Sequence, residues 1–167
     1  MSRVETILLA TDGTPASQAA DEQAILLAAE LGARLLVVSV INTTARLPVE
    51  AMVPGGLAGI ADEREALATT VQGIVQRARA AGAQATFLVW EGDPAEAIVA
   101  AAEAEHADLI VVGSHGRGPV GRFLIGSVSD HVVRHAGCPV LVVRATPELQ
   151  PRPADRPSER PAHVSHP

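Results

Sequence analysis

The chain has 167 residues, of which 47% are hydrophobic and 2% aromatic, so it is large enough for one domain whose core is built from Val, Leu, Ile and Ala. Its formal net charge of −6 argues against general binding to nucleic acid or to anionic membranes. The longest apolar runs fall well short of the roughly 18 residues that a membrane-spanning helix needs. The first residues lead directly into a strand pattern, which predicts no signal peptide, and we therefore expect a cytoplasmic protein.

Strand and helix patterns alternate from the start of the chain. The elements expected in the first part are a strand at Thr6–Thr11, a helix capped by Thr14 with Pro15 in its first position and Gly32 at its end, a strand at Leu35–Ile41, and an irregular Gly- and Pro-containing segment at Asn42–Gly59. An irregular segment of that length in a compact domain is typical of a flap or binding element.

The same alternation continues to the end of the expected domain. It predicts a helix at Ile60–Ala81, a strand at Thr86–Trp90, a helix from the Asp93-Pro94 start to about Glu105, a strand at Leu109–Val112, a helix at Ser127–Ala136 and a strand at Val140–Val143. Strands that alternate with helices in this way predict a parallel sheet with helices on both faces.

The composition changes after residue 144. Residues 145–167 hold six of the chain's 12 prolines, and their acidic and arginine side chains balance in number. Such a segment lacks the apolar residues that a packed layer requires. We therefore expect one domain at 1–144 and a disordered tail rich in Pro and Arg at 145–167.

A glycine-rich loop follows the strand expected at Leu109–Val112. It contains Gly113, Gly116, Gly118, Gly121 and Gly126, and it leads into the helix that begins at Ser127. Glycines allow the backbone to approach a ligand closely, and a helix N-terminus offers N–H groups and a positive dipole end to an anion such as phosphate. All 13 basic residues are arginine, so the lysine-containing P-loop motif is excluded.

The spacing Gly113-x2-Gly116-x9-Gly126-Ser127 resembles the nucleotide-binding signature of the universal stress protein family, G-x2-G-x9-G-[ST]. Near the N-terminus, Ile7–Asp12 (ILLATD) is similar to the first strand of that family and its terminal aspartate. The resemblance extends over roughly Val4–Arg144. It implies a doubly wound α/β fold of the adenine nucleotide alpha hydrolase-like type, with a five-stranded parallel sheet in the order 3-2-1-4-5.

That strand order would place a switch point between the first and fourth strands, where open α/β sheets bind ligands. Asp12 lies at the end of the first strand and Gly113 at the end of the fourth, so the two residues would meet at the switch point. The expected binding residues for ATP with Mg²⁺ are Ala10, Asp12, Val40, Val112, Gly113, Gly116, Arg117, Gly126, Ser127, Val128 and Ser129.

The roles expected of these residues follow from their chemistry and, in part, from the resemblance. Gly113 and Gly116 would let the backbone turn under the phosphates, while Ser127, and in addition Ser129, would donate hydrogen bonds to them. The resemblance implies that Asp12 binds ribose hydroxyls and that the backbone of Val40 binds the adenine edge. Arginines of the loop, Arg117 and Arg122, are either phosphate ligands or solvated charges.

Three structural alternatives remain open on the sequence alone. Ser127-Val-Ser-Asp130 also matches a capping box, so the loop and helix could form without a ligand, and Asp12 could simply stabilise a turn. His131 and His135 have the spacing of a two-histidine metal face, but the sequence offers no further ligand nearby, and surface histidines are the expectation. The single cysteine, Cys138, is expected to be an inert buried thiol.

The function that these observations favour is an ATP-binding universal stress protein that acts as a nucleotide-dependent regulatory module and is not an enzyme. A weak ATPase and a nucleotide-free interaction module are the alternatives; the chain lacks the lysine and the positioned base of fast phosphoryl transfer. We also expect a homodimer through Val140–Val143, because an edge strand of four apolar residues is an aggregation hazard unless it is covered. The family resemblance implies the same kind of dimer.

Overall fold

The computed structural model describes residues 3–44, 56–114 and 126–144, and these form five strands and four helices. In chain order they are β1 (Thr6–Ala10), α1 (Gln18–Leu31), β2 (Arg34–Asn42), α3 (Gly56–Ala80), β3 (Gln84–Gly92), α4 (Pro94–Ala104), β4 (Leu109–Gly113), α5 (Ser127–His135) and β5 (Val140–Val143).

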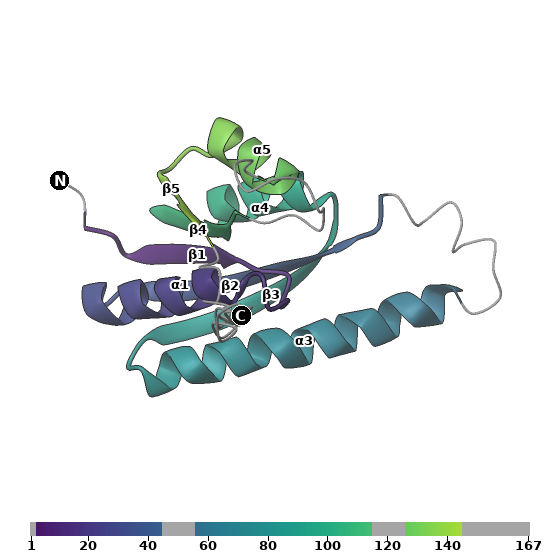
Figure 1. Ribbon diagram of the computed structural model, residues 1–167, viewed down its shortest axis with the longest axis horizontal. Coiled ribbons are helices and arrows are strands. Elements are labelled where there is room, and N and C mark those ends of the chain that lie inside the picture. Colours follow the sequence, from purple (N-terminus) through teal and green to yellow (C-terminus); the bar gives the residue numbers. More distant parts are fainter. Residues whose placement is uncertain (1–2, 45–55, 115–125, 145–167) are drawn as a thin grey trace, which may run out of the picture.

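All five strands are parallel, and they lie side by side in the order β3-β2-β1-β4-β5 (Figure 1). The central strand is β1, in which Leu9 is paired with Val37 of β2 on one side and with Val111 of β4 on the other. The predicted fold class and strand order are therefore confirmed.

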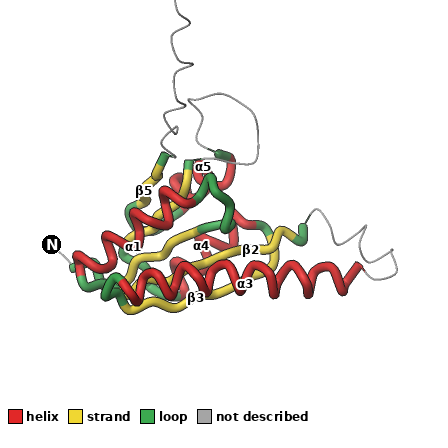
Figure 2. The backbone as a smooth tube through the Cα atoms, turned by 60° about the horizontal axis from the view of Figure 1, so that its bottom comes forward, coloured by secondary structure: helices red, strands yellow, loops and turns green. Residues whose placement is uncertain are grey.

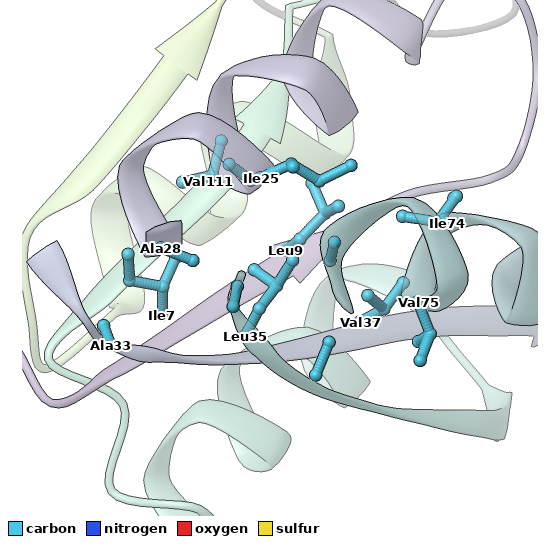
Figure 3. Close-up of a cluster of buried hydrophobic side chains, with 14 of the residues drawn as sticks. Ile7, Leu9, Ile25, Ala28, Ala33, Leu35, Val37, Ile74, Val75 and Val111 are labelled. Carbon is cyan, nitrogen blue, oxygen red and sulfur yellow. The ribbon is translucent and has the colours of Figure 1, made fainter. Parts of the chain in front are cut away.

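Helices cover both faces of the sheet, which explains why the strands read as continuous apolar runs. Alternate residues of β1 point to opposite faces: Ile7 and Leu9 pack in a core with α1 and α3, and Leu8 and Ala10 pack in a second core with α4 and α5. Figure 2 shows this layering, and Figure 3 shows the first core, in which Leu9 lies among side chains of α1, α3 and the neighbouring strands.

Helix α1 begins three residues later than the Thr14-Pro15 pattern predicts. Its N-cap is Ser17, whose side chain makes no capping hydrogen bond, and the residues before it form a turn in which the Ser17 N–H donates to the Thr14 carbonyl over 3.0 Å. The Thr14 hydroxyl instead donates to Asp12 Oδ1 over 2.7 Å. The predicted cap is wrong because this side chain is used by the turn that follows β1.

Helix α3 and the strands beside it are longer than their apolar patterns predict. Helix α3 starts at Gly56, inside the segment expected to be irregular, while 45–55 lie outside the described residues. Strands β2 and β3 pair over nine residues each, from Arg34 with Gln84 to Asn42 with Gly92. Because their backbones pair with each other, both strands continue beyond the residues whose side chains are buried. The long strand pair and α3 together extend one end of the molecule (Figure 1).

The start of α4 agrees with its predicted cap. The Asp93 carboxylate accepts hydrogen bonds from the N–H groups of Ala95 and Glu96, at 2.9 and 3.1 Å, and Pro94 occupies the first helical position. This cap fixes the N-terminus of α4 next to the end of β3, at the same side of the sheet as the carboxyl ends of the other strands.

Candidate functional site

A cavity of about 280 Å³ lies at the carboxyl ends of β1, β2 and β4. The described residues that line it are Ala10, Thr11, Asp12, Ser17, Val38, Val40, Asn42, Glu63, Pro94, Ile98, Val112, Gly113, Gly126, Ser127, Val128 and Ser129. The crossover connections from the neighbouring strands β1 and β4 leave toward opposite faces of the sheet, which makes this position the topological switch point where open α/β sheets bind ligands.

The structure brings together nine of the eleven residues that the sequence proposes for ligand binding. They come from three strand ends and from the first turn of α5, and they are Ala10, Asp12, Val40, Val112, Gly113, Gly126, Ser127, Val128 and Ser129. The other two, Gly116 and Arg117, lie outside the described residues, as do His115 and Arg122.

Asp12 is both a turn residue and part of the cavity wall. Its Oδ1 accepts from the N–H and the hydroxyl of Thr14, at 3.0 and 2.7 Å, which orients an otherwise exposed carboxylate. Both bonds use the same oxygen atom. A carboxylate has a second oxygen, and that atom is chemically suited to accept hydrogen bonds from the hydroxyls of a sugar.

At the end of β4, the described neighbours do not require a glycine at position 113. A Cβ built on Gly113 would lie 3.8 Å from Ser17 Cα and 4.0 Å from the Ala16 carbonyl oxygen, which are ordinary contacts. The packing of the described chain therefore gives no reason to exclude a side chain here. A ligand that approaches the backbone from the cavity would supply that reason.

The first turn of α5 lies across the cavity from β1, and its two serines have different roles. Ser127 is exposed in the first helical position, whereas Ser129 is 5% exposed and its hydroxyl donates to the Gly113 carbonyl over 2.6 Å. The expectation that Ser129 offers its hydrogen to a ligand is wrong, because β4 uses it. Ser129 instead ties the start of α5 to the end of β4.

The predicted capping box in α5 does not form. Gly126 is the N-cap, without a side-chain capping bond, and its carbonyl accepts from the Asp130 N–H over 2.8 Å. The Asp130 carboxylate accepts from Arg134 Nε over 2.9 Å, one turn further along the helix. The first N–H groups of a helix have no acceptor within the helix, so the N-terminus of α5 presents donors at the cavity.

The sequence reasoning missed several lining residues because they come from elements whose contacts it could not place. Val38 lies two residues before Val40 on β2, so both side chains point to the same face of the sheet. The sequence alone could therefore have added Val38 to the expected lining residues. Ile98 and Pro94 reach the cavity through the docking of α4, and Glu63 through α3. Among the described lining residues the charged side chains are the two carboxylates, Asp12 and Glu63.

Two other candidates remain outside this site. The rings of His131 and His135 stack with their centroids 4.0 Å apart, and the described residues contain no group of three or more side chains that would hold a metal ion. Cys138 is partly buried, and burial, together with the charge of Asp108, raises the pKa of its thiol, which keeps the sulfur in its unreactive form.

The fold and the cavity define an open, doubly wound α/β protein with a ligand crevice at its switch point. The sequence model of the universal stress protein family matches residues 3–144, and the chain belongs to this family. One relative, the universal stress protein in the QAH/OAS sulfhydrylase 3′ region of Thermus aquaticus, is 38% identical over 140 residues, which are 84% of this chain and 98% of the relative.

Solved structures of the family share the fold. The universal stress protein UspA from Lactobacillus plantarum superposes with a TM-score of 0.75 at 26% identity, over 86% of this chain and all of that one. A universal stress protein in complex with cAMP superposes with a TM-score of 0.62 at 27% identity, over 87% of this chain and 100% of the other. Within the described part of the present chain, no helix is long and apolar enough to cross a membrane.

Proposed function

We propose that this universal stress protein binds ATP, accompanied by Mg²⁺, in the switch-point cavity, and that it acts as a nucleotide-dependent regulatory module in a stress response. The observation that carries the proposal is the convergence of the Asp12 turn, the end of β4 at Gly113 and the N-terminus of α5 at Ser127 on one cavity. A related protein in complex with cAMP supports an adenine nucleotide as the ligand class.

The phosphate end of the ligand would lie against Gly113 and the N-terminus of α5. Backbone N–H groups and a helix dipole attract phosphate without any basic side chain, which suits a chain that contains no lysine. The exposed Ser127 hydroxyl adds one donor. Mg²⁺ would be held mainly by the phosphate oxygens and by water, as is usual for this ion.

The base and sugar would occupy the other end of the cavity. Val38, Val40, Pro94 and Ile98 supply apolar walls for a flat ring. The Asp12 carboxylate has an oxygen to offer the ribose hydroxyls, and the backbone of β2 at Val40 has polar groups for the base edge.

Calorimetry with ATP and Mg²⁺ tests this proposal directly. Gly126→Val should abolish the binding heat, because Gly126 lines the cavity as the N-cap of α5, and a side chain there would crowd the phosphates at the helix N-terminus. Gly137→Val is the matched control, since a Cβ there meets nothing within 4 Å and the residue lies after α5. Absence of binding heat from the unmodified protein at millimolar nucleotide would contradict the proposal, as would unchanged binding by Gly126→Val.

We propose further that the protein holds nucleotide without turning it over rapidly. The chain has no lysine, and both charged lining residues of the described site are acidic, which gives little stabilisation to the developing charge of phosphoryl transfer. A phosphate-release assay should give a turnover below the enzyme range. A kcat above about 1 s⁻¹ would instead identify an ATPase.

The open edge of β5 supports a homodimer in which two copies of Val140–Val143 pair in antiparallel fashion. The carbonyls of Pro139 and Val143 accept from Ile110 and Ser114 of the β4 side, so alternate residues, including Val142, direct their backbone groups to the open edge. Val142→Pro removes an edge N–H and leaves the β4 ladder intact.

Light scattering should therefore report a dimer for the unmodified protein and a monomer for Val142→Pro. A circular dichroism spectrum of the variant shows whether the fold is retained. A folded Val142→Pro dimer, or a monomeric unmodified protein at tens of micromolar, would refute pairing through β5.

A further inference from the structure

Three buried polar side chains lie beneath the switch-point cavity, where β1 meets the start of α1. Thr11, Ser17 and Asp21 are 7%, 8% and 4% exposed. Thr11 and Ser17 also line the cavity, while Asp21 lies one turn deeper along α1 and lines a second cavity of about 470 Å³ between the β1–α1 turn, α1 and α3. This buried polar cluster (Thr11, Ser17, Asp21) therefore separates the two cavities.

The hydroxyls of the cluster form a directed chain of hydrogen bonds. Thr11 Oγ1 donates to Ser17 Oγ over 2.9 Å, and Ser17 Oγ donates to the Thr14 carbonyl over 2.9 Å. Thr11 Oγ1 also accepts from the Gly13 N–H over 3.2 Å. Thr11 has one hydroxyl hydrogen, which this arrangement gives to Ser17. The same hydrogen can instead be donated to the Asp21 carboxylate, and the second lone pair of Thr11 can accept a hydrogen bond.

The Asp21 carboxyl is incompletely satisfied in this arrangement. Its Oδ1 is buried without a hydrogen-bond partner, and Oδ2 lies 4.0 Å from Nη2 of Arg77, too far for a hydrogen bond. Burial raises the pKa of Asp21; the nearby Thr11 hydroxyl and Arg77 oppose that rise, and the charges of Asp12 and Glu22 add to it. A proton on Asp21 would relieve both the burial of charge and the missing bond.

The same cluster contacts the parts of the cavity assigned to phosphate and sugar. A Cβ built on Gly113 would lie 3.8 Å from Ser17 Cα, so the end of β4 faces the start of α1. The Thr11 carbonyl accepts from the Ser39 hydroxyl over 2.6 Å, which fixes the end of β1 to β2. Asp12, in the cavity wall, acts electrostatically on Asp21. A change of charge in the cavity is therefore felt at Asp21.

We propose that Asp21 is a proton-binding site linked to nucleotide binding, with Thr11 as the relay between them. With a proton bound, Asp21 donates to Thr11, Thr11 to Ser17 and Ser17 to the Thr14 carbonyl, and the turn that lines the cavity is fully hydrogen-bonded. Without that proton, the Thr11 hydrogen turns to the carboxylate and Ser17 loses its donor. The proton comes from solvent through the second cavity.

The direction of the linkage follows from charge. MgATP carries net negative charge, which disfavours a carboxylate nearby, so nucleotide binding favours proton uptake at Asp21 and protonation favours nucleotide binding to the same extent. This inference rests on the proposed nucleotide site. It makes Asp21 a positioning residue, which acts on the ligand through the turn that contains Thr11 and Ser17.

Calorimetry of MgATP binding at about pH 6, in two buffers with different ionisation enthalpies, measures the protons taken up. The unmodified protein should take up a measurable fraction of a proton more than Asp21→Asn, in which a neutral side chain of the same shape replaces the carboxyl. Protonation of ATP and of histidines contributes equally to both proteins and cancels in the difference. Glu30→Gln, which removes an exposed carboxylate near the far end of the same helix, should behave as the unmodified protein.

The affinity should show the same linkage. Between about pH 5 and pH 7 the unmodified protein should lose at least threefold in MgATP affinity relative to Asp21→Asn; tenfold corresponds to a shift of one pKa unit on binding. Thr11→Val keeps the buried shape and removes the relay, so its extra proton uptake should fall to the part carried by charge alone, and it serves if Asp21→Asn does not fold. Equal proton uptake by all folded proteins that bind MgATP would overturn the inference, whereas absence of heat from the unmodified protein would overturn the nucleotide site itself.

Discussion

Replacement of Ser129 by alanine should destabilise the fold, although the residue lies in the cavity wall. Ser129 is 5% exposed and its hydroxyl donates over 2.6 Å to the Gly113 carbonyl, so Ser129→Ala leaves a partly buried acceptor without this donor. Such a loss costs about 1–3 kcal/mol. Alanine returns up to about 0.5 kcal/mol through its helix propensity. The net loss expected is therefore about 0.5–3 kcal/mol, or a fall in Tm of roughly 1–12 °C for a domain of this size.

Ser127→Ala is the matched control, because it makes the same substitution two residues earlier in the same helix. Ser127 is exposed and its side chain makes no capping bond, so the stability should change by less than about 0.5 kcal/mol. Its hydroxyl is proposed to contact phosphate. A hydrogen bond to a charged group contributes about 1.5–3 kcal/mol, so MgATP affinity should fall roughly 10- to 100-fold.

Urea denaturation followed by circular dichroism, with calorimetry of MgATP, separates the two effects. Ser129→Ala should lower the denaturation midpoint at an unchanged slope, and Ser127→Ala should lower affinity at an unchanged midpoint. If Ser129→Ala were as stable as the unmodified protein, the bond between α5 and β4 would not have the structural role argued for it. Equal stability losses in both variants would also refute the assignment.

Three further substitutions test the elements around the site by urea denaturation. Gly13→Ala should lower the free energy of unfolding by about 1–3 kcal/mol, because φ is +70° and the new Cβ would lie 2.7 Å from Thr70 Cγ2. Gly73→Ala is the control: a Cβ there, in the interior of α3, meets nothing within 4 Å, so the substitution should be neutral or stabilising. Asp93→Ala should cost about 0.5–2 kcal/mol, because it removes the cap of α4. The Asp108 carboxylate accepts hydrogen bonds from two N–H groups at the start of β1, and these bonds lower its pKa. Its contribution to the stability of the fold is therefore present above the ordinary carboxyl pKa and is lost as the pH falls. Asp108→Asn should therefore be less stable than the unmodified protein at pH 7, with a difference that shrinks below about pH 4.

The features that could be predicted from the sequence are those set by local patterns. Apolar runs define the strands, and the Asp93-Pro94 pair defines the start of α4, because each depends on residues adjacent in the chain. The strand order was not contained in those patterns; it came from the family resemblance, and the structure confirms it. The same resemblance brought Asp12 and Gly113 to one crevice.

The features that could not be predicted depend on contacts between distant elements. Helix α3 begins at Gly56 and continues through Gly59, although glycine is a poor helix former, because extending an existing helix is far less costly than starting one. Glu63 reaches the cavity only through the docking of that helix. Ser127 and Ser129 look equivalent in sequence, yet two residues along a helix turn a side chain to the opposite face, so one meets solvent and the other meets β4.

An acidic protein proposed to bind a polyanion must keep its own carboxylates from opposing the ligand, and three carboxylates near this cavity, Asp130, Asp12 and Asp21, are each controlled in a different way. Asp130, in the first turn of α5, is paired with Arg134 one turn further along the helix. Asp12 is oriented by two hydrogen bonds from Thr14 to one of its oxygens. Asp21 is buried, where a raised pKa favours the neutral form. Local pairing, a turn and burial thus make the proposed phosphate site compatible with a net charge of −6, since the attraction proposed for phosphate comes from backbone N–H groups that the charge balance does not count.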